Sequence, residues 1–131
     1  MYDVVERPRP ISNGMRKILI DIRLLGSGKI SGVEEYTRLL LDQIFASDKK
    51  NEYTLFYNGF RKAPLPESWG NHTNVSVINT FIPNKLLGLS LKFLRWPPIE
   101  YFCKADIVFS PHLNLLMAGK NTKRIITFHD L

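Results

Sequence analysis

The chain has 131 residues, which is enough for one domain with a single core and too few for two full domains. Hydrophobic residues make up 44% and charged residues 23%, a balance that is typical of a globular protein and excludes a disordered one. The 18 Lys and Arg against 12 Asp and Glu give a net charge of +6, so anionic lipid, phosphorylated substrates and nucleic acid are the partners to consider.

The chain shows no sign of export or of crossing a membrane. Residues 1–14 lack the apolar run of a signal peptide, and no stretch approaches the ~20 apolar residues of a membrane span. The single cysteine, Cys103, excludes an internal disulfide framework and fits a reducing compartment. We therefore expect a cytoplasmic protein, with a flexible extension at 1–14 and one folded domain at 15–131.

The first predicted elements are a short apolar strand over 17–22 and a helix over 32–47. Val33, Tyr36, Leu40 and Ile44 recur at helical spacing. Just before the helix, Ser31 and Glu34 have the S-x-x-E spacing of a capping box, which fixes the start of the helix at residue 32.

The rest of the chain alternates between further strands and helical segments. Strands are predicted over 53–57, 75–78, 107–110 and 124–128. An amphipathic helix is predicted over 84–95 and a helical turn over 99–104, with loops at 58–74 and 111–122. The last strand contains an apolar run, which predicts that it is buried and that His129 and Asp130 follow its end.

This alternation predicts an α/β fold, a Rossmann-like parallel sheet with helices on both faces. In the usual strand order 3-2-1-4-5, ligands bind beyond the carboxyl ends of the strands. Three loops then open onto one crevice, and their polar residues are the candidate site: Ser31 and Gly32, Ser110 and His112, and His129 and Asp130.

The glycine-rich loop before the long helix does not match either nucleotide-binding pattern. Arg23 stands where a P-loop needs glycine, and Ser31 stands where a dinucleotide fingerprint needs its third glycine. A helix beginning at Gly32 still offers amides and a positive dipole end to a phosphate. The alternative is that Ser31 only caps a core helix, with Glu34 and Glu35 repelling any nearby phosphate.

Each candidate histidine has a structural and a functional interpretation. His129 either donates to a backbone carbonyl or contacts a ligand in the crevice, where Asp130 orients it or caps the next helix. His112 has the same two interpretations. The histidines and Cys103 lack metal-ligand spacing, so no metal site is expected.

Residues 82–98 carry the basic excess, because Lys85, Lys92 and Arg95 stand among large apolar residues without any acid. They form either a peripheral membrane helix or an ordinary crossover helix with solvated cations. The first interpretation gives the alternative function: a non-catalytic α/β module that contacts an anionic membrane or a protein partner through 82–98. No RNP-like or Arg-rich pattern supports a nucleic-acid partner.

Four stretches in order resemble the N-terminal domain of family-4 glycosyltransferases, which have the GT-B fold. They are residues 15–23, 31–41, 51–56, and 105–112 together with 125–131. The resemblance implies a retaining transferase that moves a sugar from a nucleotide-sugar donor to a glycan or glycolipid acceptor without a metal or other cofactor. Its N-terminal domain holds the acceptor, and such an enzyme would act in the cytoplasm, with possible placement at the inner membrane face.

The same resemblance assigns roles to individual residues. Gly32 matches the glycine that approaches the donor phosphates, and His129 matches the histidine that contacts the donor sugar, with Asp130 beside it. Ser110 and His112 match the acceptor-side loop. Glu34-Glu35 departs from the Gly-Arg pair that is frequent in the family. The donor-binding C-terminal domain is absent from these 131 residues, so the expected unit is truncated, inactive alone, and dependent on that domain in cis or trans.

Overall fold

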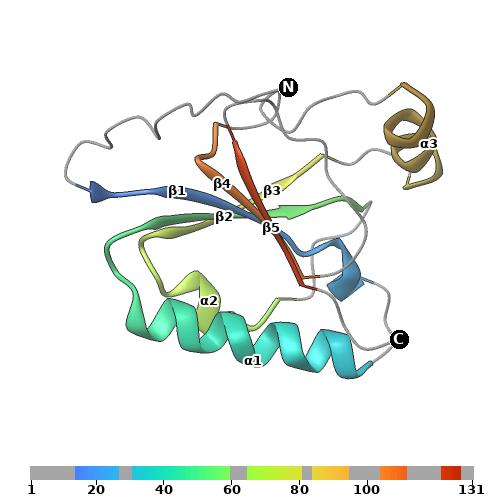
Figure 1. The fold of residues 1–131 in the computed structure, drawn as a ribbon. Coiled ribbons are helices and arrows are strands. Elements are labelled where there is room, and N and C mark those ends of the chain that lie inside the picture. The colour runs from blue at the N-terminus through green and yellow to red at the C-terminus, as the bar shows by residue number, and fades with distance from the viewer. Residues whose placement is uncertain are drawn as a thin grey trace.

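Five parallel strands form one sheet in the computed structural model, which describes residues 14–26, 31–59, 65–80, 84–94, 104–111 and 122–127. The order across the sheet is β3-β2-β1-β4-β5, as predicted (Figure 1). The strands are β1 (Lys17–Asp21), β2 (Glu52–Tyr57), β3 (Val75–Asn79), β4 (Ile107–Ser110) and β5 (Lys123–Ile126). The α/β Rossmann-like fold class is therefore confirmed.

Helices flank this sheet on both sides in Figure 1, with α1 (Gly32–Ser47) and α2 (Glu67–Gly70) below it and α3 (Asn84–Leu89) on the other side. The bounds of α1 are those predicted. The prediction of a continuous loop over 58–74 is wrong, because α2 lies within it. The predicted helix over 84–95 divides into α3 and a π-helical segment, Ser90–Leu94. The predicted helical turn over 99–104 lies almost wholly outside the described residues.

The core fills the space between the sheet and the helices α1 and α2. Ile20, Leu41, Phe45, Leu55 and Trp69 belong to one buried cluster there. The rings of Phe45 and Trp69 meet edge to face, with centroids 5.4 Å apart, an arrangement that adds to the stabilisation from burial. The cluster fixes the position of α1 along the sheet.

Burial in the sheet falls off towards β5. Leu19, Phe56 and Val108, on the face opposite α1, are also fully buried, as expected for inner parallel strands. The prediction that the last strand is buried is wrong for its described part, because β5 is an edge strand and Ile125 is 51% exposed.

A tight polar turn joins α1 to β2 at the amino edge of the sheet. The carboxylate of Asp48 accepts hydrogen bonds from the backbone amides of Lys50 (2.8 Å) and Asn51 (3.2 Å). It also accepts from the Asn51 side chain (2.6 Å) and the Tyr53 hydroxyl (2.5 Å). The side-chain amide of Asn74 donates to the backbone carbonyls of Asp48 and Asn51, which ties the start of β3 to the same turn.

These donors favour the ionised form of Asp48. The hydrogen bond from Tyr53 is the largest cause, the Asn51 side chain and the two amides add to it, and partial desolvation opposes it; together they lower the pKa of Asp48 to about 2. Burial and the neighbouring carboxylate raise the pKa of the Tyr53 hydroxyl well above its usual range. Tyr53 therefore remains a hydrogen-bond donor over the whole range in which the domain would be studied.

Asp48→Asn should remove a pH-dependent part of the free energy of unfolding. Because the folded-state pKa of Asp48 lies below its ordinary value of 3.8, its stabilisation is present above pH 4 and is lost as the pH falls towards 2. We expect a wild-type advantage of about 1 kcal/mol at pH 6, reduced for solvent exposure, that disappears near pH 2. Urea unfolding of both proteins across this range measures it. Tyr53→Phe should lose part of the same pH dependence, and an advantage that is constant with pH would contradict the assignment.

Candidate functional site

The carboxyl edge of the sheet is lined by buried polar side chains. Asp21 is fully buried, and Asn58 and Ser110 are each 3% exposed. Ile20 pairs with Phe109, so the next residues along, Asp21 and Ser110, end neighbouring strands about 4.8 Å apart. This is the switch point of the sheet, where a fold of this class leaves room for a ligand.

Asp21 forms an ion pair with Arg23, two residues further along the chain. The Nε and Nη2 atoms of Arg23 donate to the two carboxylate oxygens of Asp21 at 2.9 and 2.7 Å. The backbone amide of Arg23 donates to the same carboxylate at 3.1 Å, and the guanidinium lies 5.9 Å from the centroid of the Phe56 ring. The bidentate pair supplies partners for a carboxylate that has no exposure to water.

The loops after β2 and β3 are joined to each other at the same edge. The Thr80 hydroxyl donates to Asn58 Oδ1 at 2.7 Å, and the Gly59 amide donates to Asn79 Oδ1 at 3.2 Å. These two bonds satisfy polar groups at the strand ends and hold the two loops in a fixed relation. Their role is to shape this edge of the sheet.

The start of α1 is an exposed part of the carboxyl edge. The Ser31 hydroxyl accepts from the Glu34 amide at 3.3 Å, and the Ser31 carbonyl accepts from the Glu35 amide at 3.0 Å. The predicted capping role of Ser31 is therefore confirmed. Ser31 and Gly32 are both exposed, and a Cβ atom added to Gly32 would meet nothing within 4 Å. Packing against the described residues therefore gives no reason for glycine at position 32.

The structure describes three of the six predicted site residues. Ser31 and Gly32 are accessible, whereas Ser110 is buried at the end of β4 and is not itself an open contact. The Thr127 amide donates to the Ser110 carbonyl at 3.0 Å, so β5 ends at the same edge as β4. His112, His129 and Asp130 lie outside the described residues, and their roles stay predictions.

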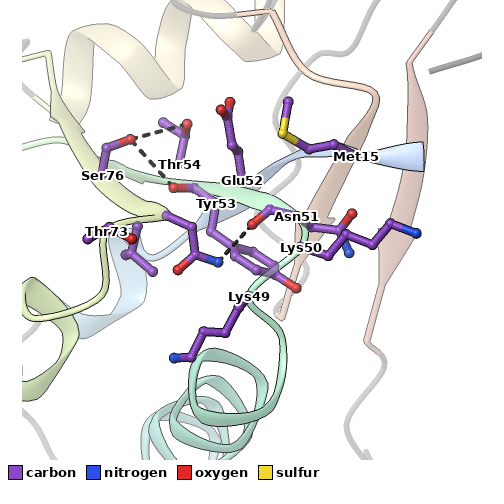
Figure 2. A pocket seen from close by; sticks show the side chains of 11 residues that line it. Met15, Lys49, Lys50, Asn51, Glu52, Tyr53, Thr54, Thr73 and Ser76 are labelled. Carbon is purple, nitrogen blue, oxygen red and sulfur yellow. Dashed lines mark hydrogen bonds between the residues drawn. The ribbon is translucent and has the colours of Figure 1, made fainter. Parts of the chain in front are cut away.

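Two hollows lie away from the carboxyl edge. One, of about 410 Å³, opens at the amino edge and is shown in Figure 2; Lys49, Asn51, Thr54 and Ser76 are among the residues that line it. Lys49 is held there by the Phe45 carbonyl (2.5 Å) and by His72 Nδ1 (2.7 Å). Ligands of open parallel sheets bind at the opposite edge, so this hollow does not replace the carboxyl edge as the candidate site.

The other hollow is an apolar groove of about 350 Å³ beside α1. Leu40 and Ile44 of α1 form one wall, and Phe109 and Ile125 are among the sheet residues that form its floor. It contains few polar groups that could orient a ligand.

Neither a metal cluster nor a membrane span is found in the described parts of the chain. Over residues 14–26, 31–59, 65–80, 84–94, 104–111 and 122–127, no three His, Cys, Asp or Glu side chains are grouped so that they could hold a metal ion. No helix within those same ranges is long and apolar enough to cross a bilayer.

Asp21→Asn should destabilise the domain, because it leaves the Arg23 guanidinium beside a neutral amide in a mostly buried setting. We expect a loss of about 2–4 kcal/mol in the free energy of unfolding, measured by urea denaturation. Arg23→Met alone should also lower the free energy of unfolding, because it leaves the Asp21 carboxylate buried without its ion-pair partner. The double variant should lose less than the sum of the two, because it leaves no unpaired charge. Additive losses would show that the pair is not coupled.

The chain was compared with known proteins by sequence and by structure. No protein family model, no curated protein and no solved structure matches it. The fold class is therefore established by the sheet topology itself, and the resemblance to glycosyltransferases rests on the sequence stretches described above.

Proposed function

We propose that residues 15–131 form the acceptor-side domain of a retaining glycosyltransferase, which moves a sugar from a nucleotide-sugar donor to a hydroxyl of a glycan or glycolipid. The observation that carries the proposal is the exposed Ser31-Gly32 step, where a 16-residue helix begins after β1. The strand order and the sequence resemblance support it, since both cover the same residues.

The start of α1 suits a donor phosphate for electrostatic reasons. The first amides of a helix point out of its end, where they act with the helix dipole as roughly half a positive charge. The backbone amides of Glu34 and Glu35 donate hydrogen bonds to the hydroxyl and the carbonyl of Ser31. The two helix positions that precede them are Gly32 and Val33. A diphosphate oxygen can approach the backbone closely at Gly32, because no side chain there intervenes.

The proposed reaction places negative charge on that phosphate. The bond from the anomeric carbon to the phosphate oxygen breaks, and the acceptor oxygen bonds to the same face of the sugar while its proton passes to the leaving phosphate. Amides fixed at the helix start would stabilise the developing charge without reorganisation. His129 and Asp130, which follow β5 in the sequence, are the proposed contacts to the sugar, and His112 belongs to the proposed acceptor loop.

Glu35 sets a limit on this arrangement, because its exposed carboxylate is in the first turn of α1. Glu34 is also in this turn and is 7% exposed, so solvent screens its charge less than that of Glu35. Turnover requires a donor-binding domain, which these 131 residues do not include, so activity is to be tested on a gene product that contains one.

Gly32→Ala separates a ligand-binding role from a structural one. Alanine favours the helix and has space here, so the melting temperature should be unchanged or slightly higher. If a donor phosphate approaches Gly32, the added methyl should lower kcat/KM for transfer by at least about tenfold, which corresponds to ~1.4 kcal/mol. A panel of nucleotide sugars in the presence of a chelator provides the assay. Wild-type kcat/KM in the Ala variant would remove Gly32 from the site.

His129→Ala tests the proposed sugar contact in the same two-domain product. Loss of one preorganised donor can lower turnover by ~10²–10³, and we expect at least a tenfold fall in kcat. His72→Ala, on the opposite side of the fold in the turn before β3, provides a histidine control. Absence of transfer from every nucleotide sugar, with a folded second domain present, would overturn the proposed function itself.

A further inference from the structure

An apolar patch is concentrated on α3 and the π-helical segment that follows it. Leu86, Leu89, Phe93 and Leu94 are 59%, 55%, 68% and 72% exposed. Four large hydrophobic side chains thus face water within one eleven-residue helical stretch, Asn84–Leu94. Scattered exposed leucines are ordinary, but a contiguous group of this kind marks a contact surface.

The patch has the pattern of a surface helix with a cationic margin. Leu86 and Leu89 stand at i and i+3 of α3, which places them on one side of that helix, and Phe93 is exposed one turn further along. Lys85 and Lys92 are next to Leu86 and Phe93 in the sequence, and both are exposed. The Lys92 ammonium lies 5.6 Å from the centroid of the Phe93 ring, which keeps cation and apolar surface together.

The charged residues within this stretch of the sequence all have one sign. No Asp or Glu occurs between residues 80 and 99, so no carboxylate near in the sequence neutralises these lysines. The helix lies on the side of the sheet away from α1 (Figure 1). A surface that combines exposed leucines with unneutralised cations complements a partner that is apolar beneath a layer of negative charge.

We propose that α3 and the segment after it dock the domain on an anionic lipid bilayer. Leu86, Leu89 and Phe93 enter the boundary between headgroups and acyl chains. Lys85 and Lys92 extend their apolar stems along the same surface and place their ammonium groups at the lipid phosphates. This docking is independent of the proposed transfer reaction, and its test does not use enzyme activity.

The first experiment measures co-sedimentation of the full 131-residue chain with vesicles. The chain should bind vesicles of phosphatidylcholine mixed with phosphatidylglycerol, and should bind vesicles of phosphatidylcholine alone much more weakly. Added salt should weaken the binding. Lys85→Ala/Lys92→Ala should lower the partition coefficient roughly 30-fold, at about 1 kcal/mol for each cation. The control variant Lys50→Ala/Lys123→Ala removes the same charge at two exposed positions outside the patch. It should change the partition coefficient less than about twofold.

A second pair of variants tests the apolar contact. Leu86 and Leu39 are both 59% exposed, but Leu39 is on α1, outside the patch. Leu86→Ser should weaken vesicle binding at least about fivefold, and Leu39→Ser should leave it unchanged. Both variants should keep the wild-type melting temperature, because both side chains face solvent.

Three outcomes would overturn the proposal. Equal binding to both kinds of vesicle would remove the electrostatic component, and wild-type binding by Leu86→Ser would remove the apolar one. In the third outcome the wild-type chain does not bind either kind of vesicle and sediments as an oligomer, whereas the Leu86→Ser variant is monomeric. The patch would then be an interface between copies of this chain.

Discussion

The parallel alignment of all five strands determines most of what this domain can do. It brings every strand's carboxyl end to one edge, and it leaves β1 in the centre, paired with β2 on one side and β4 on the other. Charged side chains cannot be buried within such a sheet without partners, so the Asp21 carboxylate at the end of β1 is paired at once with Arg23. The arrangement of polar groups at the edge follows from that central strand.

The two edges of the sheet have different physical characters. At the amino edge, Asp48, Asn51 and Asn74 use their polar atoms on one another, and the resulting turn connects α1 to β2 and β3. At the carboxyl edge, the deeper polar groups are also satisfied, but the start of α1 remains accessible at Gly32. The amino edge is therefore held together by internal hydrogen bonds, and the carboxyl edge leaves the backbone at Gly32 accessible.

Most of the fold could be predicted from the sequence, because local signals and burial agree there. The Ser31 cap and the spacing of Leu40 and Ile44 fix α1, and short apolar runs fix the inner strands. The helix α2 was missed because it has only four residues and depends on the tertiary burial of Trp69. The bond between Asp21 and Arg23 was also missed: an acid that ends a strand looks solvated until the topology places it inside. Exposure of β5 depends on its edge position, which hydrophobicity alone does not reveal.

The apolar groove beside α1 marks where the cover of the sheet by α1 ends. The strands on the two sides of this groove should therefore separate from the sheet with different ease. The strand order places β4 and β5 on the opposite side of β1 from β2 and β3, and the α1 residues of the buried cluster pack mainly against β1 and β2. Amide hydrogens of β1 and β2, under fully buried side chains such as Leu19 and Leu55, exchange only when the domain unfolds as a whole. Those of β5, with three of its four side chains exposed, exchange through local separation of a single edge strand. Hydrogen exchange is therefore expected to be slow in β1, which precedes Gly32 in the chain, and fast in β5.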